Sequence, residues 1–153
     1  MVRASVLPSY GYDERLRLIA DWKLWIDCLA SGGHFGYVDG VLARYRRHTQ
    51  SITLNSQKNA QLHQITFTDT LMTLSLVEAS YPHLLEDCRY ARARLFYTEG
   101  VWRLLRGEAK NARIYLLNSL RNSFVSWKVP TWLLLTFMPK AMVGKTLQRF
   151  AHA

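Results

Sequence analysis

Apolar residues recur at helical spacing over most of the chain after Asn55. Positions three and four residues apart lie on one face of an α-helix, so this spacing predicts helices that each bury one face. Three runs follow the pattern, and they end at Tyr81-Pro82, at Gly107 and near Asn122. Their apolar positions are Leu62, Ile65, Leu71, Leu74 and Val77; then Leu84, Cys88, Ala91, Leu95, Trp102 and Leu105; then Ala112, Leu116, Leu117 and Leu120.

The segment before Asn55 has a mixed pattern. Val2 to Leu7 is β-prone, and a helical pattern then runs to about Ser31, where Gly32 and Gly33 supply a left-handed stop. The stretch HFGYVDGVLARYRR is again β-prone, and Asp39-Gly40 predicts a tight turn between two short extended runs. We therefore expect an α+β fold that is mainly α, with a small α/β piece over residues 1–54 and a helical region over 55–153.

Small residues in the helical region predict a close contact between two helices. Ala93, Gly100 and Ala112 stand where an antiparallel pair would touch, and Gly107-Glu108 lies between the two helices. This arrangement resembles one tetratricopeptide-type hairpin. A generic αα-hairpin is the preferred interpretation, because no second full copy follows and at least three such repeats are needed to fold alone.

The composition indicates an ordered protein of one core or two small ones. The chain has 153 residues, of which 49% are hydrophobic. Cys28 and Cys88 lie inside apolar periodic segments without a CxxC pattern, which is typical of reduced core thiols in a cytosolic protein. The first residues lack the apolar region of a signal peptide, and no run reaches the roughly 18 to 20 apolar residues of a spanning helix.

Charge is unevenly distributed along the chain. The net charge of +9 favours anionic partners, and all acidic residues lie at or before Glu108. One basic cluster, Arg44, Arg46 and Arg47, falls in RYRRHTQS, and a second lies in the last thirty residues. Nucleic acid is the weaker partner class, because the basic residues do not line one recognition helix and no RNP-like aromatic pattern accompanies them.

Asp21 lies among the apolar residues of LRLIADWKLWIDCLASGG, where an unpaired buried charge would be very costly. It therefore either caps the helix, pairs with a cation such as Arg17, or does chemistry. Capping and chemistry are compatible, because a helix start is an exposed place from which a side chain reaches a ligand. Asp27, six residues later, is expected to face solvent on the same helix.

Three short motifs follow one another in the first third of the chain. They are SYGYDE (Ser9 to Glu14), IADW (Ile19 to Trp22) and YRRHTQS (Tyr45 to Ser51). A glycine loop, then an acid and an aromatic residue at a helix start, then a strand ending in Tyr-Arg-x-His resembles the second half of family 2 glycosyltransferases, which have a GT-A-type fold. The resemblance covers about Val2 to Thr53.

The resemblance implies a role for several residues. Asp21 would be the catalytic base, with Ala20 where the family often has a second acid, and Gly11 would lie in the loop beside the sugars. Arg46 would contact the diphosphate, and His48 would approach a divalent metal ion, Mg²⁺ or Mn²⁺. The implied substrates are a nucleotide-diphospho-sugar donor and a glycan or lipid-linked acceptor.

The chemistry of these residues agrees with such a role. An inverting transfer needs a carboxylate that takes the proton of the acceptor hydroxyl, and partial burial of Asp21 against Trp22 and Trp25 would raise its basicity. Aromatic side chains stack on the apolar faces of sugar rings. Trp22, Trp25 and Tyr45 are therefore candidate walls of the acceptor site.

The sequence lacks the nucleotide-binding half of such an enzyme. It contains no Asp-x-Asp motif and no βαβ segment before Ser9. We therefore expect the chain to be the C-terminal part of a glycosyltransferase, inactive unless another polypeptide supplies the donor half.

The tail indicates an alternative function. TWLLLTFM lies between Pro130 and Pro139, with Trp127 and several lysines nearby, a combination suited to an anionic membrane surface. Packing of a last helix on the preceding hairpin explains the same apolar residues equally well. The alternative to a transferase is therefore a non-catalytic helical interaction module at the membrane surface, in the cytoplasm or on the inner face of the plasma membrane.

Overall fold

The computed structural model describes residues 4–45, 59–124 and 126–138. Five α-helices account for most of them, and no strand is assigned within these ranges. The prediction of a mainly α protein is therefore confirmed. The chain divides into two compact units, Met1–Leu84 and Leu85–Ala153. The predicted boundary at residues 54 and 55 lies outside the described residues.

The predicted extended segments of the first unit do not form strands in the described part of the chain. Ala4–Val6 is a short 3-10 helix, η1, and residues 34–45 have no regular structure. Tyr37 and Val41 are each 91% exposed, so neither run is covered by another element. A hairpin without a third strand or a packed helix is only marginally stable, which accounts for the missing strands.

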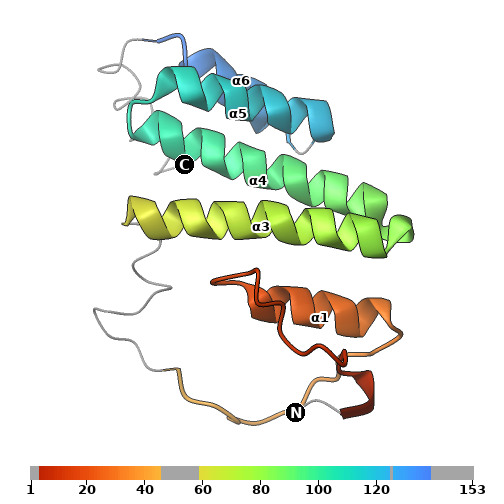
Figure 1. Ribbon diagram of the computed structural model, residues 1–153. Helices are drawn as coiled ribbons and strands as arrows, with labels where there is room; N and C mark the ends of the chain where they lie inside the picture. The colour runs from red at the N-terminus through yellow and green to blue at the C-terminus, as the bar shows by residue number, and fades with distance from the viewer. Residues whose placement is uncertain (1–3, 46–58, 125, 139–153) are drawn as a thin grey trace. The chain divides into compact units, whose positions relative to one another are not determined.

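The first unit contains α1 (Ala20–Ala30) and α3 (Ala60–Ser80), which pack on each other, followed by the 3-10 helix η2 (Pro82–Leu84) (Figure 1). The end of α1 and the start of α3 are formed by glycine and asparagine residues that favour helix ends. Gly32 has φ of +89°, and the N–H of Gly33 donates to the carbonyl of Cys28 (2.9 Å), which closes the end of α1. At the other helix, the Asn59 side chain accepts hydrogen bonds from the N–H groups of Gln61 and Leu62 (2.9 and 3.3 Å).

The second unit is a three-helix arrangement of α4 (Leu85–Leu105), α5 (Ala109–Asn122) and α6 (Lys128–Leu135) (Figure 1). The predicted αα-hairpin is confirmed as α4 and α5, joined at Gly107, which has φ of +83°. Ala93 and Ala112 are fully buried, and the hydroxyl of Ser119 donates to the carbonyl of Ala93 (2.8 Å) across the pair. Small residues therefore bring the two helices together, as predicted.

A polar cluster holds the turn between α4 and α5. Arg103 donates to the buried carboxylate of Glu99 (2.7 Å) and to Glu108 (2.8 Å), and its guanidinium lies 5.1 Å from the ring of Tyr115. Burial alone lowers the pKa of Arg103, but the two carboxylates outweigh it and raise that pKa. Hydrogen bonds from Asn111 and then Arg103 lower the pKa of Glu108. The turn is therefore fixed by charge as well as by packing.

Both cysteines are buried, at 5% exposure for Cys28 and 4% for Cys88, and neither is in a disulfide. The prediction of core thiols is confirmed. The remaining buried apolar residues of the first unit come from α1, α3 and the loop before α1, and those of the second unit come from all three helices. They are Leu16, Leu24, Phe67, Leu74 and Val77 in the first unit, and Ala93, Leu104, Ala112, Leu116, Val129 and Leu135 in the second.

Gly100 is predicted to be required for the close approach of α4 and α5. A Cβ atom at this position would lie 2.7 Å from Cγ of Leu116, which is fully buried. Gly100→Ala should lower the free energy of unfolding by about 1 kcal/mol, because overpacking of about 1–3 kcal/mol exceeds the gain of about 1 kcal/mol in helix propensity. Thermal unfolding followed by circular dichroism measures the change.

The matched control for this prediction is a double-mutant cycle with Leu116→Ala. Removing the opposing side chain should make the Gly100→Ala change favourable, because only the gain in helix propensity is left. A Gly100→Ala protein more stable than the wild type would contradict the close contact.

Candidate functional site

The first unit contains a cleft of about 410 Å³. It lies where the loop before α1 meets α1 and the last part of α3. Its walls are rich in tyrosine and in charged residues of both signs, a composition suited to a polar ligand with apolar faces. The residues are Tyr10, Tyr12, Asp13, Glu14, Arg15, Lys23, Leu76 and Ser80.

A buried ion pair lies beside this cleft. The Lys23 ammonium is 2.6 Å from both carboxylate oxygens of Asp27, one turn later on α1, and the two residues are only 5% and 1% exposed. Tyr10 donates its hydroxyl hydrogen to the same carboxylate. The three side chains satisfy one another, which is the condition for charges to be buried without a large penalty.

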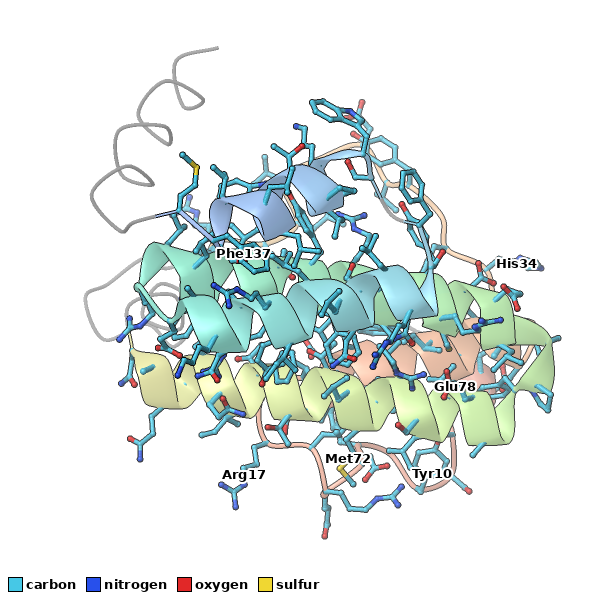
Figure 2. The ribbon with its side chains drawn as sticks, turned by 90° about the horizontal axis from the view of Figure 1, so that it is seen from above. Tyr10, Arg17, His34, Met72, Glu78 and Phe137 are labelled. Carbon is cyan, nitrogen blue, oxygen red and sulfur yellow. The ribbon has the colours of Figure 1, made fainter. Side chains whose placement is uncertain are left out.

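Tyr10 connects the loop to this ion pair. Its ring is largely exposed and lies 5.8 Å from the Lys23 ammonium, while its hydroxyl reaches the buried carboxylate. In Figure 2, Tyr10 and Arg17 are both seen on the loop that leads to α1. Desolvation of the phenol, followed by the hydrogen bond to Asp27 and its charge, raises the pKa of Tyr10. Desolvation and the charge of Asp27 also raise the pKa of Tyr81, so both phenols stay protonated near neutral pH.

A second buried carboxylate fixes the end of the loop. Asp69, on α3, is 5% exposed and accepts hydrogen bonds from the backbone N–H groups of Arg17 (2.8 Å) and Leu18 (2.7 Å). These two residues immediately precede the N-terminal end of α1. Asp69 therefore sets where α1 begins relative to α3.

The rim of the cleft carries a bidentate ion pair. Arg15 donates from Nε to one oxygen of Asp13 (2.8 Å) and from a terminal nitrogen to the other (2.7 Å), and its backbone N–H also bonds to Asp13 (3.1 Å). The side-chain hydrogen bonds from Arg15 lower the pKa of Asp13 to about 2. The same bonds raise the pKa of Arg15.

Asp21 is exposed, in contrast to the apolar burial predicted for it. It lies in the first turn of α1, and the N-cap position belongs to Ile19, so the alternative in which Asp21 caps the helix is excluded. Its carboxylate accepts a hydrogen bond from the backbone N–H of Trp22 (2.9 Å). No salt bridge to Asp21 is found among the described residues, so the alternative in which it pairs with Arg17 is not observed either.

Asp27 is buried, and the prediction that it faces solvent is wrong. The buried face of α1 consists of Lys23, Leu24, Asp27 and Cys28, which repeat at helical spacing. Trp22 lies on the opposite side of the helix and is 57% exposed. The apolar residues around Asp21 in the sequence are therefore spread around the helix and do not enclose it.

The other predicted site residues do not gather at one place in the described part of the chain. Gly11 adopts φ of +64°, and its N–H donates to the carbonyl of Pro8 (3.1 Å), so it forms a tight turn between Tyr10 and Tyr12 of the cleft. Trp25 is half-buried, with its ring edge against Phe35 at 6.2 Å, and Tyr45 is 66% exposed. Asp21 and Trp22 are not cleft-lining residues. Arg46 and His48 lie outside the described residues.

No group of three or more His, Cys, Asp or Glu side chains suitable for a metal ion occurs in residues 4–45, 59–124 and 126–138. At the cleft, the carboxylate of Asp13 is bonded to Arg15 and that of Asp27 to Lys23. The divalent metal that the family resemblance implies stays a prediction, because its expected ligand, His48, lies outside the described residues.

Sequence reasoning missed Tyr10, Lys23 and Asp27. The signal for the ion pair was present, because Lys23 and Asp27 are four residues apart and share a face with Leu24 and Cys28. Nothing in the sequence pairs Tyr10 with Asp27, since seventeen residues separate them. Asp69 was missed for the same reason.

The Tyr10 hydroxyl is predicted to stabilise the first unit. Tyr10→Phe leaves the buried Asp27 carboxylate with one donor fewer, which should lower the free energy of unfolding by about 1–3 kcal/mol. Tyr12→Phe is the matched control, because this neighbouring cleft tyrosine is exposed to a similar extent, 59% against 57% for Tyr10. Urea unfolding of both variants measures the difference, and equal stabilities would contradict the buried hydrogen bond.

The Asp13–Arg15 pair predicts a pH dependence. The folded pKa of Asp13 is about 2 and its ordinary value is 3.8, so the pair stabilises the fold above about pH 4 and is lost as pH falls towards 2. Arg15→Gln should return the pKa of Asp13 towards 3.8 in a carboxyl NMR titration, whereas Arg17→Gln should leave it low. An Asp13 pKa near 3.8 in the unmodified protein would refute the bidentate pair.

Comparison with known proteins identifies no relative of this chain. No protein-family model matches the chain, and no curated protein or solved structure matches it significantly.

Proposed function

We propose that the chain forms the acceptor side of the catalytic domain of an inverting family 2 glycosyltransferase, with Asp21 as the catalytic base. The observation that carries the proposal is the exposed carboxylate of Asp21 in the first turn of α1, beside the exposed indole of Trp22. A base must reach the hydroxyl of its substrate, and an exposed carboxylate with no cationic partner in the described chain can do so.

The fixed start of α1 supports this role for Asp21. Asp69 holds the N–H groups of Arg17 and Leu18, and the buried face of α1 is anchored through Lys23 and Asp27. Asp21 therefore stands on a positioned helix end. Such positioning contributes to catalysis because a base must be held within hydrogen-bond reach of the proton that it removes.

The proposed reaction is a single displacement. The acceptor hydroxyl oxygen attacks the anomeric carbon of the donor sugar and transfers its proton to Asp21. The bond from that carbon to the nucleoside diphosphate breaks, and its electron pair leaves with the diphosphate oxygen. Trp22 is suited to stack on a sugar ring of the acceptor, because its indole is exposed one residue after the base.

The donor side of the site is proposed to come from residues other than those described. The substrates would be a nucleotide-diphospho-sugar and a glycan or lipid-linked acceptor, with the protein acting at the cytoplasmic side of a membrane. Each of these assignments follows from the family resemblance carried by Gly11, Asp21, Trp22 and the Tyr45 segment.

The second candidate is a non-catalytic helical interaction module. It is favoured by exposed apolar side chains on the second unit, which include Leu105, Ile114 and Leu117 on α4 and α5. This function would not depend on Asp21. Binding of a partner that is unchanged by loss of the Asp21 carboxylate, without any glycosyl transfer, would favour it.

Asp21→Asn is predicted to abolish transfer. The experiment joins the chain to the nucleotide-binding half of a family 2 glycosyltransferase and measures turnover with a panel of nucleotide sugars and carbohydrate acceptors. Loss of the base should lower turnover at least about a hundredfold. Because the Asp21 side chain is exposed, the thermal stability should change little.

Asp39→Asn is the matched control, because Asp39 is another exposed aspartate of the same unit. It should leave turnover unchanged. Equal activity of the Asp21→Asn and wild-type proteins, or no transfer by the wild-type protein with any donor, would contradict the proposal.

A further inference from the structure

The outward side of α6 is apolar. Trp127 at the start of the helix is 68% exposed and Leu134 is 70% exposed. Seven residues separate them, which is close to two helical turns, so both lie on one side of α6. Phe137 and Met138 follow the helix with 66% and 36% exposure, and Figure 2 shows Phe137 just beyond its end. We call Trp127, Leu134, Phe137 and Met138 the α6 patch.

The opposite side of α6 is already used for packing. Val129 is fully buried, and Leu135 and Trp132 pack with Leu104 and Ala112 of the hairpin. Arg113 of α5 donates to the carbonyl of Thr136 (2.8 Å) and to its hydroxyl (3.0 Å). α6 therefore cannot rotate to bury the α6 patch without losing this core and these hydrogen bonds.

Positive charge accompanies the patch. Lys128 is exposed next to Trp127, and the Arg113 guanidinium lies 4.0 Å from the centre of the Phe137 ring. The sequence from Phe124 to Ala153 contains Lys128, Lys140, Lys145 and Arg149 and no acidic residue. The partner must therefore offer an apolar layer together with negative charge.

We propose that the α6 patch docks on an anionic lipid bilayer surface. A bilayer interface offers an apolar layer for Leu134 and Phe137, a headgroup region for Trp127 and anionic lipid for Lys128. A second copy of the chain fits less well, because two such basic surfaces would repel each other. Among the described residues, no helix has the length and apolar content that crossing a membrane requires.

This inference does not depend on glycosyl transfer. It uses residues of α5, of α6 and directly beside α6, and its test contains no donor or acceptor. Loss of the catalytic role of Asp21 and loss of membrane contact would therefore be seen in separate experiments.

The test is sedimentation of the full chain with lipid vesicles. The chain should bind vesicles of equal parts phosphatidylcholine and phosphatidylglycerol and should not bind vesicles of phosphatidylcholine alone. Binding should weaken with added salt, because screening shortens the reach of the lysine charges. Equal binding to both vesicle types, or no binding to either, would overturn the proposal.

Charge variants locate the contact. Lys128→Glu should weaken binding about thirtyfold, the effect of two charge units at an anionic surface. Arg94→Glu is the matched control, because it makes the same change in net charge at an exposed position of α4 and should have a much smaller effect. Equal losses in the two variants would show attraction by net charge alone and would overturn the assignment to α6.

Apolar variants test the patch itself. Leu134→Ser should weaken vesicle binding about tenfold, whereas Ile114→Ser, at a 57% exposed position of α5, should not. Circular dichroism of each variant confirms that the helices are retained. The wild-type chain could instead self-associate in the absence of lipid, and Leu134→Ser could abolish that self-association. This result would identify a second copy as the occupant and would overturn the proposal.

Discussion

The hydrogen bonds from the backbone N–H groups of Arg17 and Leu18 to the buried carboxylate of Asp69 are the constraint on which the first unit depends. They join the loop before α1 to α3, more than fifty residues later in the chain. A buried carboxylate is stable only with such donors, and an N–H group at a helix start needs an acceptor, so each satisfies the other. The position of α1 on α3 is set by this exchange as well as by apolar contact.

A fixed start of α1 determines which side chains face inward and which face outward. Lys23 and Asp27 are turned towards the core, where Tyr10 completes their hydrogen bonds and ties the cleft loop to the helix. Asp21 and Trp22 are then exposed. The buried acid of α1 is therefore structural and the exposed acid is the candidate for chemistry, the reverse of what apolar surroundings in the sequence indicate. The second unit adds a separate surface, the α6 patch, which is outward because the inner side of α6 is fastened by Arg113.

Local signals made the helical part of the fold predictable from the sequence. The sequence predicted the end of α3 at Tyr81-Pro82, the turn at Gly107 and the end of α5 at Asn122. Each of these signals, a proline, a left-handed glycine or the end of the apolar periodicity, depends on only a few neighbouring residues. The strands expected around Asp39 were not found, because strand formation depends on a partner that β-prone residues alone do not provide. The hydrogen bonds of Asp27 with Tyr10 and of Asp69 with Arg17 and Leu18 were not predictable, since these partners lie seventeen or more residues away.

The most direct test of this account is amide hydrogen exchange at Arg17 and Leu18 in the wild-type protein and in the Asp69→Ala variant. Both amides should be well protected in the wild type, because their N–H groups donate to a buried carboxylate. Protection should be lost in the variant, while the amides of the α4–α5 hairpin keep theirs. Rapid exchange of Arg17 and Leu18 in the wild-type protein would contradict this account, since the start of α1 and the exposed Asp21 would then not be held in place.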